Sequence, residues 1–131
     1  ETRYYGKFFV TFNYEESVLK YKTLKLILQP VIENAIFHGI VPKNGIGSIR
    51  IGIEEYEDKI VYTVTDNGVG MEEDRIHDIF QQTEQNHFNK LGLYNVDKRI
   101  KLRFGEEYGL KMKSRVGWQT EVTITIPKGM E

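Results

Sequence analysis

The chain has 131 residues, of which 40 % are hydrophobic and 28 % are charged, and its formal net charge is −1 at pH 7. These values are typical of one soluble globular domain with a sizeable core. The near-neutral charge argues against a general polyanion binder such as a nucleic-acid protein. The absence of cysteine excludes disulfides and thiolate metal sites. The sequence has no recognisable signal peptide and no apolar run near the roughly 20 residues that span a bilayer.

The first half of the chain alternates between strand and helix patterns. Residues 7–14 (KFFVTFNY) have the period-two alternation of a strand. A helix is predicted from about residue 23 to residue 40. Pro30 lies inside it and lacks an N–H donor, which predicts a kink or a later start. After the loop VPKNGIG, residues 48–55 and 58–66 alternate and predict an antiparallel hairpin.

The second half begins with residues 71–80 (MEEDRIHDIF), a predicted short helix with acids in its first turn. Residues 81–91 are polar and aperiodic, which predicts a mobile segment. Residues 92–105 form a predicted helix that ends in a capping glycine, and 109–114 and 120–127 are two further strands. The order predicts an α/β (α+β) two-layer sandwich, in which about three helices cover one face of a mixed, mostly antiparallel sheet.

Asp66 ends a predicted strand with its side chain on the same side as Ile60, Tyr62 and Val64, the apolar side. A buried, unpaired carboxylate costs several kcal/mol, so a hydrogen-bond donor is expected beside it. One interpretation of the DNG sequence is a simple Asx turn made by Asp66 and Asn67. The other is a pocket in which Asp66 accepts from an amino group of a flat heterocycle. The glycines of DNGVG would let the backbone approach such a ligand closely.

Residues 31–40 (VIENAIFHGI) place three polar side chains in an otherwise apolar helix. Asn34 and His38 are four residues apart and share a face, with Glu33 about 100° around the helix. They could form a satisfied buried network. Alternatively, the Asn34 carbonyl oxygen could bind Mg²⁺, which takes few protein ligands and keeps waters and phosphates.

Gly92 precedes a predicted helix and follows a polar segment, an arrangement that leaves backbone N–H groups free. These groups and the helix dipole suit a phosphate, and Lys90 could add a positive charge. An ordinary helix N-terminus is the alternative.

Four stretches taken together are more specific than any one of them. LQPVIENAIFHG, DNGVGM, LGLYNVDKRI and GWQTEVTITIP occur in this order. They resemble the N box, G1 box, G2 box and final strand of the ATP-binding catalytic domain of sensor histidine kinases, and LQP…ENA…HG resembles the LytS/YesM subgroup. The resemblance covers about Lys7 to Pro127. It implies the Bergerat fold of gyrase, Hsp90 and MutL-type ATPases.

The resemblance implies a role for each motif. Asp66 would accept from the adenine 6-amino group with support from Thr120, Asn34 would bind Mg²⁺, and residues from about Glu72 to Leu91 would form a lid over ATP. It also implies one catalytic domain over residues 1–131, with residues 1–6 as the tail of an upstream dimerisation or phosphoacceptor helix. The implied nucleotide contacts are Asn34, His38, Asp66, Gly68, Gly70, Met71, Lys90, Gly92, Leu93 and Thr120.

Three positions depart from related patterns. Lys90 stands where the broader kinase pattern has a first glycine, and Phe37 stands where a lysine is common. Pro30 occupies the position of the water-activating glutamate of related ATPases, so efficient hydrolysis is not expected. Transfer to a histidine is easier to reconcile, because imidazole is nucleophilic near neutral pH. Glu33 is a candidate catalytic group that would orient the acceptor.

The acceptor histidine is expected elsewhere, because His38, His77 and His87 do not lie in segments that resemble a dimerisation helix. The resemblance therefore implies an upstream phosphoacceptor domain, an indirect response-regulator partner and a cytoplasmic domain of a membrane-anchored bacterial sensor kinase without direct membrane contact. The isolated fragment should bind ATP and hardly autophosphorylate. The alternatives are an anti-sigma-factor-type serine kinase on the same fold and a degenerate nucleotide-binding or docking module.

Overall fold

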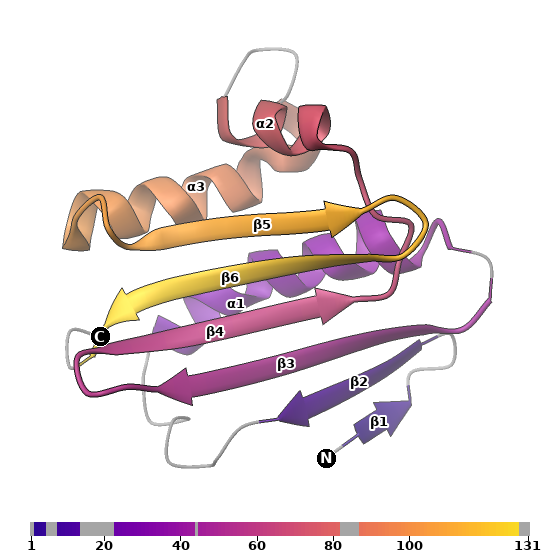
Figure 1. Cartoon of the computed structure of the whole chain (residues 1–131), viewed down its shortest axis with the longest axis horizontal. Helices are drawn as coiled ribbons and strands as arrows, with labels where there is room; N and C mark the ends of the chain where they lie inside the picture. The colour runs from indigo at the N-terminus through magenta and orange to yellow at the C-terminus, as the bar shows by residue number, and fades with distance from the viewer. Residues whose placement is uncertain (1, 5–7, 14–22, 44, 82–86, 129–131) are drawn as a thin grey trace.

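The computed structural model describes residues 2–4, 8–13, 23–43, 45–81 and 87–128. The described strands form one six-stranded sheet in the order β1-β2-β3-β4-β6-β5 (Figure 1). β2 and β3 pair in parallel, and the other neighbouring strands pair antiparallel. The elements in chain order are β1 (Thr2–Tyr4), β2 (Phe8–Asn13), α1 (Thr23–Asn34), the π-helix η2 (Ala35–Ile40), β3 (Gly47–Glu55), β4 (Lys59–Asp66), α2 (Glu73–Gln81), α3 (His87–Phe104), β5 (Gly109–Arg115) and β6 (Gln119–Pro127).

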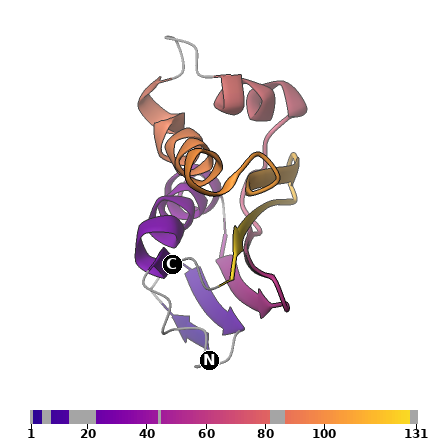
Figure 2. The same cartoon turned by 90° about the vertical axis from the view of Figure 1, so that its left-hand side faces the viewer.

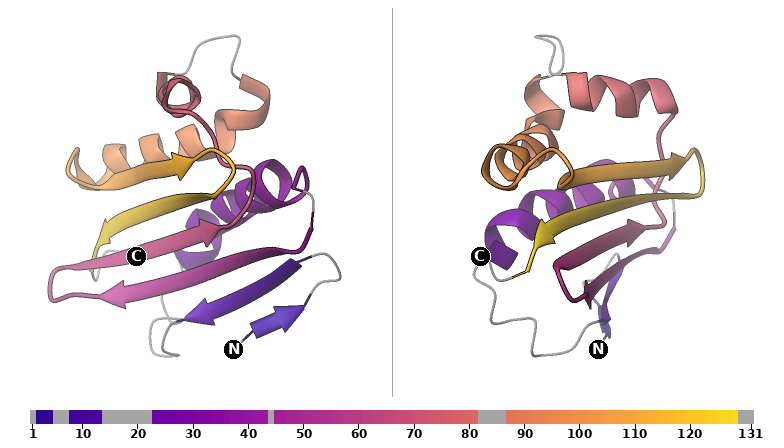
Figure 3. Two further views of the ribbon diagram at one scale, coloured as in Figure 1. Left: turned by 45° about the vertical axis from the view of Figure 1, so that its right-hand side comes forward. Right: turned by 60° about the vertical axis from the view of Figure 1, so that its left-hand side comes forward.

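The helices form the second layer. α1 and α3 lie side by side over one face of the sheet, and α2 lies beyond β5 beside α3 (Figures 1, 2 and 3). The predicted two-layer α/β sandwich with a mixed, mostly antiparallel sheet and one covered face is confirmed. No described helix combines the length and apolar character needed to cross a bilayer.

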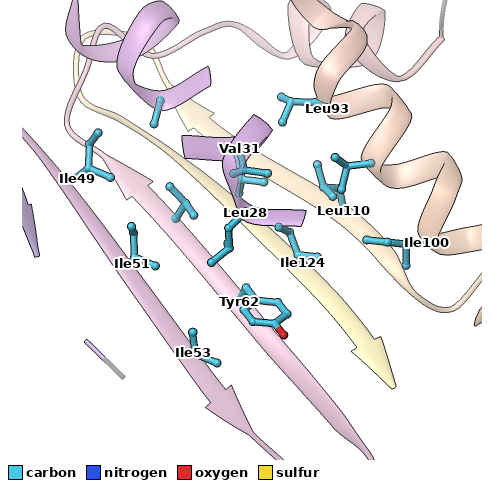
Figure 4. Close-up of a cluster of buried hydrophobic side chains, with 14 of the residues drawn as sticks. Leu28, Val31, Ile49, Ile51, Ile53, Tyr62, Leu93, Ile100, Leu110 and Ile124 are labelled. Atoms are coloured by element: carbon cyan, nitrogen blue, oxygen red, sulfur yellow. The ribbon is translucent and has the colours of Figure 1, made fainter. Parts of the chain in front are cut away.

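The core fills the space between the sheet and α1 and α3 (Figure 4). In β4 the alternate residues Ile60, Tyr62 and Val64 are almost fully buried, as their spacing predicts. Leu28 and Val31 of α1 are buried against the same face of the sheet. In α3 the buried residues are Leu93, Val96 and Ile100. Because the apolar face of β4 points at the helices, its last side chain on that face, Asp66, also points inward.

The N-terminal residues differ from the prediction. Thr2–Tyr4 form the short strand β1, which pairs antiparallel with β2, so a helix tail over residues 1–6 is wrong for these three residues. β2 offers an unpaired edge at this place, and a hydrogen-bonded ladder satisfies the backbone groups of both segments.

Two helix boundaries also differ. α1 begins at Thr23 and continues through Pro30, so the alternative of a later start is wrong. The backbone changes instead to a π-helix at Ala35, and the N–H of Val41 bonds to the carbonyl of Ile36 at 2.9 Å, five residues back. α3 begins at His87, five residues before the predicted start. A glycine inside a helix costs only about 1 kcal/mol, so one glycine does not stop it.

Candidate nucleotide-binding site

Asp66 is the central buried polar residue of the candidate site. It lies at the end of β4 with 3 % of its surface exposed. Its Oδ1 accepts a hydrogen bond from the N–H of Gly68 at 2.8 Å. The prediction of a donor beside a buried carboxylate is therefore confirmed, in the form of a local turn. A single backbone donor occupies Oδ1, which leaves Oδ2 available to a ligand that carries N–H groups.

The burial of Asp66 changes its acid–base behaviour. Desolvation raises the pKa of this carboxyl from 3.8 to about 6, and the hydrogen bond from Gly68 opposes the rise. The carboxyl is ionised at neutral pH and becomes protonated in mildly acidic solution. It is thus a hydrogen-bond acceptor at pH 7 and loses part of that capacity below pH 6.

Glycines around Asp66 bring two backbone segments, η2 and the loop after β4, into close contact. A Cβ atom added at Gly68 would lie 2.2 Å from the carbonyl oxygen of Gly39, and one added at Gly39 would lie 2.6 Å from Asp66 Oδ1. The N–H of Val69 donates to that same Gly39 carbonyl at 3.1 Å. The loop after β4 therefore rests directly on the backbone of η2, with no side chain between them.

The β5–β6 turn holds the other side of this loop. The N–H of Gly117 donates to the Val69 carbonyl at 2.7 Å. Gly70 has a φ of +72°, and a Cβ there would lie 2.1 Å from the carbonyl oxygen of Arg115. The loop is thus fixed between η2 and the turn, at the side of the sheet where β4 ends and β6 begins (Figure 1).

Thr120 faces Asp66 across the β4–β6 ladder, because the two residues are register partners. It is 2 % exposed, and its Oγ1 lies 2.7 Å from Ser114 Oγ. Ser114 Oγ also accepts from the N–H of Met71 at 2.8 Å. The proximity of Thr120 to Asp66 agrees with the prediction, but its hydroxyl bonds to Ser114. Its support of adenine recognition stays a prediction.

Sequence reasoning did not identify Ser114. The signal is the alternation of β5, where Ser114 has the same parity as the core-facing residues Leu110 and Met112. A hydroxyl on the buried side of a strand needs partners. The register that pairs Ser114 with Thr120 supplies them, but this register is visible only in the folded chain.

A second group of predicted residues surrounds a cavity of about 190 Å³ between α1, η2 and α3. Asn34 is 9 % exposed there, and its side chain does not cap the helix that follows. Its amide oxygen is therefore available to a ligand. The cavity is lined by Pro30, Glu33, Asn34, Phe37, His38, Gly92 and Leu93.

The charges near this cavity differ from the expectation for a phosphate site. Partial burial lowers the pKa of His38, and the positive charge of Arg75 lowers it further. A neutral imidazole gives no fixed positive charge, so His38 is not equivalent to the missing lysine at Phe37. Arg75, on α2, is a cation close enough to influence His38, and no sequence pattern identified it in advance. The side chain of Lys90 lies outside the described residues.

The other predicted site residues lie in α3, at the cavity rim and in the predicted lid. Gly92 and Leu93 lie inside α3, so the prediction that Gly92 opens a helix is wrong. Their presentation of amides to a phosphate stays a prediction. Glu33 is exposed at the cavity rim, where Gln29 Nε2 donates to its Oε2 at 3.2 Å. Most of the predicted lid between Glu72 and Leu91 is helical, and residues 82–86 lie outside the described residues.

The donor and acceptor chemistry fits Mg²⁺ and an adenine nucleotide. Asp66 supplies a buried acceptor, Gly39 and Gly68 allow the loop after β4 to pack directly on η2 beside it, and Asn34 supplies an oxygen to the neighbouring cavity. The described residues contain no group of three or more acids and histidines able to hold a metal alone. Mg²⁺ bound to nucleotide phosphates keeps several waters and takes few protein ligands, and the Asn34 amide oxygen could serve as one of them.

A sequence profile of the histidine kinase-, DNA gyrase B- and HSP90-like ATPases matches residues 20–130. The chain belongs to this family. Among curated proteins it is 38 % identical over 104 residues to the sensor histidine kinase YpdA of Escherichia coli, with 78 % of this chain and 17 % of YpdA covered. It is 40 % identical over 103 residues to the sensor histidine kinase YesM of Bacillus subtilis, with 79 % and 17 % covered. With the sensor protein LytS of Bacillus anthracis the identity is 29 % over 129 residues, with 98 % and 22 % covered.

Solved structures agree with this family assignment at the level of the fold. The catalytic domain of the histidine kinase ThkA superposes with a TM-score of 0.69 at 21 % identity, covering 93 % of this chain and 79 % of that domain. The blue-light activated histidine kinase of Erythrobacter litoralis gives 0.67 at 19 % identity, covering 94 % and 36 %. The chain is a catalytic domain of the sensor histidine kinase type. It spans about a fifth of the length of the curated relatives named above, 17–22 %.

Proposed function

We propose that the domain binds ATP with Mg²⁺ and transfers the γ-phosphoryl group to a histidine on an upstream domain of the same protein. The observation that carries the proposal is the buried carboxylate of Asp66, which faces Thr120 at one end of the site and lies next to η2. Neighbouring glycine backbone shields this carboxylate from solvent. A shielded carboxylate can recognise an exocyclic amino group by accepting its hydrogen bond.

Each part of the site has a separate task in this proposal. Asp66 accepts from the adenine amino group, and Gly68 and Gly70 keep the loop close to the base. Asn34 holds Mg²⁺, which neutralises phosphate charge when bound. Gly92 and Leu93 donate their amides to the phosphates after the first turns of α3 unwind, since those amides now lie inside the helix.

The transfer needs little chemistry from the domain itself. The acceptor imidazole nitrogen forms a bond to the γ-phosphorus while the bond to the β–γ bridging oxygen breaks and ADP leaves. The chain positions the phosphates and excludes water. Glu33, exposed at the cavity rim, orients the incoming imidazole. Pro30 has no side-chain base, so water is not activated efficiently at that position.

The partners follow from the same proposal. The upstream domain brings the acceptor histidine, and a response regulator receives the phosphoryl group from that histidine. The whole protein is a membrane-anchored sensor with this domain in the cytoplasm. The names of the relatives, which are sensor histidine kinases and a sensor protein several times longer than this chain, support the assignment to a sensor protein.

Calorimetric titration with ATP tests the nucleotide site. The wild-type chain should bind ATP with micromolar to submillimolar affinity in Mg²⁺ and more weakly in a chelator. Asn34→Ala should lose at least about tenfold in affinity in Mg²⁺ and become insensitive to the chelator, because an oxygen ligand is lost. Asn95→Ala, at an exposed position of α3, is the matched control. A folded wild type that does not bind ATP would favour the docking-module alternative.

Labelled ATP tests the transfer. The domain alone should incorporate little label, and adding the upstream domain should give an acid-labile phosphoryl group on that partner, typical of phosphohistidine. Acid-stable label on a serine would instead support the anti-sigma-factor type of kinase. No label with a folded, ATP-binding domain would contradict the proposed transfer.

A further inference from the structure

Ser114 connects three elements around the proposed adenine position. Its Oγ lies 2.8 Å from the N–H of Met71, 2.9 Å from the carbonyl oxygen of Gln119 and 2.7 Å from Thr120 Oγ1. Met71 follows the loop that contains Gly68 and Gly70, whereas Gln119 and Thr120 begin β6. One half-buried hydroxyl on β5 therefore contacts both walls of the site.

The proton positions at Ser114 follow from the chemistry of its partners. The backbone N–H of Met71 can only donate, and the carbonyl of Gln119 can only accept. Ser114 has one hydroxyl hydrogen, which the Gln119 carbonyl receives. In the contact at 2.7 Å, Thr120 must therefore be the donor and Ser114 the acceptor.

This assignment fixes the direction of the Thr120 hydroxyl. Its single hydrogen points at Ser114, so its lone pairs remain for another partner. Thr120 is the register partner of Asp66, whose ionised carboxylate also accepts only. Two acceptors on facing strands match a ligand amino group, which has two N–H donors.

We propose that Ser114 is a positioning residue for the nucleobase: it turns Thr120 into an acceptor beside Asp66 and holds the Met71 backbone, so that both hydrogens of an adenine 6-amino group are recognised. The proposal rests on the proposed function. Ser114 does not touch the base itself. Without it, the Thr120 hydroxyl rotates freely and can direct its hydrogen at Asp66 instead of accepting from the base.

A comparison of two nucleotides separates this role from a purely structural one. ATP and purine riboside 5′-triphosphate differ by the 6-amino group and share the phosphates. Their dissociation constants are measured by calorimetry in Mg²⁺ for the wild type, Ser114→Ala and Thr123→Ala. Thr123 also loses a hydroxyl, but it points to the uncovered face of the sheet, so this variant is the matched control.

The wild type and Thr123→Ala should prefer ATP. Ser114→Ala should lose about fivefold to tenfold of that preference while its affinity for purine riboside triphosphate changes by less than about twofold. Ser114→Thr, which keeps the hydroxyl, should restore the preference. In a Thr120→Val background, Ser114→Ala should remove little further preference, since it acts through Thr120.

Four results would overturn the proposal, the last of them by overturning the proposed function on which it rests. If Ser114→Ala weakens the binding of both nucleotides equally, Ser114 has only a structural role. If Ser114→Ala still removes the full preference for ATP in the Thr120→Val background, Ser114 does not act through Thr120. Wild-type binding without any preference for ATP would contradict amino-group recognition as a whole, and absence of binding would contradict the proposed function itself. If Ser114→Ala is unfolded by circular dichroism, Ser114→Cys, whose thiol forms only weak hydrogen bonds, provides the comparison.

Discussion

Asp66→Asn is expected to abolish detectable ATP binding and, at the same time, to stabilise the ligand-free domain at neutral pH. The two effects have one cause, the burial of an ionised carboxylate with a single described donor. In binding, the amide replaces an acceptor oxygen with an N–H₂ group that faces the adenine amino group. Two opposed donors and a buried unsatisfied group should weaken affinity by roughly 100-fold or more.

The stability effect has a defined sign. The pKa of Asp66 is raised from 3.8 to about 6 by folding. The folded state therefore holds this proton more tightly than the unfolded state. The resulting stabilisation is fully present below about pH 4 and is lost as the pH rises through 6. Above pH 6 the ionised Asp66 reduces the free energy of unfolding by up to about 3 kcal/mol relative to a neutral side chain.

Asn is neutral throughout this pH range, so the Asp66→Asn variant does not lose unfolding free energy through ionisation at this position. The difference in unfolding free energy between Asp66→Asn and wild type should be small at pH 4 and should grow to about 1–3 kcal/mol in favour of the variant at pH 8. Urea unfolding at both pH values measures it. Asp58→Asn, at an exposed position in the β3–β4 turn, controls for the loss of one negative charge. A variant less stable than wild type at pH 8 would mean that contacts to the carboxylate outweigh its desolvation.

The same shift predicts a pH dependence for the wild type. ATP affinity should fall as the pH decreases through about 6, because protonation removes acceptor capacity from Asp66. Thr120→Val should bind more weakly at pH 8 but retain this dependence, since the titrating group is unchanged. An affinity that is constant between pH 5 and pH 8 would contradict the central role of Asp66.

The parts of the site that the sequence could predict depend on local periodicity. Alternation in β4 is enough to direct Asp66 inward, because residues two apart on a strand share a face. The spacing of Asn34 and His38 on one helix face is equally local, and both line the same cavity. The fold follows from the same signals, since amphipathic hairpins and helices have few ways to bury their apolar faces together.

The remaining parts depend on contacts between distant segments. Ser114 meets Met71 across 43 positions of sequence, and Arg75 influences His38 from another helix. Neither interaction can be predicted from local sequence periodicity. The start of α3 at His87 could not be predicted for a different reason. A polar, aperiodic segment such as 87–91 can be helical when its neighbours are, so the boundary depends on cooperativity and not on one glycine.

Gly68→Ala is expected to be among the most destabilising single substitutions in the described part of the chain. The added Cβ would lie 2.2 Å from both the carbonyl carbon and the carbonyl oxygen of Gly39. These are backbone atoms of η2, so no side chain can rotate away. The loop must then separate from η2, breaking the hydrogen bond from Val69 to Gly39.

The matched control is Gly45→Ala. Gly45 has a φ of +98°, but a Cβ there meets no atom within 4 Å. Its substitution should cost only about 1 kcal/mol of backbone strain, whereas Gly68→Ala should cost at least about 3 kcal/mol and lower the melting temperature by roughly 10 °C. Thermal unfolding of both variants measures the difference.

Binding gives a second and independent consequence of the Gly68 contact. Asp66 Oδ1 lies 2.6 Å from a Cβ position on Gly39, so a loop displaced from η2 also changes the position of the carboxylate. At a temperature where Gly68→Ala is still folded, its ATP affinity should therefore fall about tenfold or more, with Gly45→Ala unchanged. Equal melting temperatures for the two variants would mean that the loop leaves η2 at little cost. Loss of stability with full ATP affinity would mean that the glycine contact supports the fold without positioning Asp66.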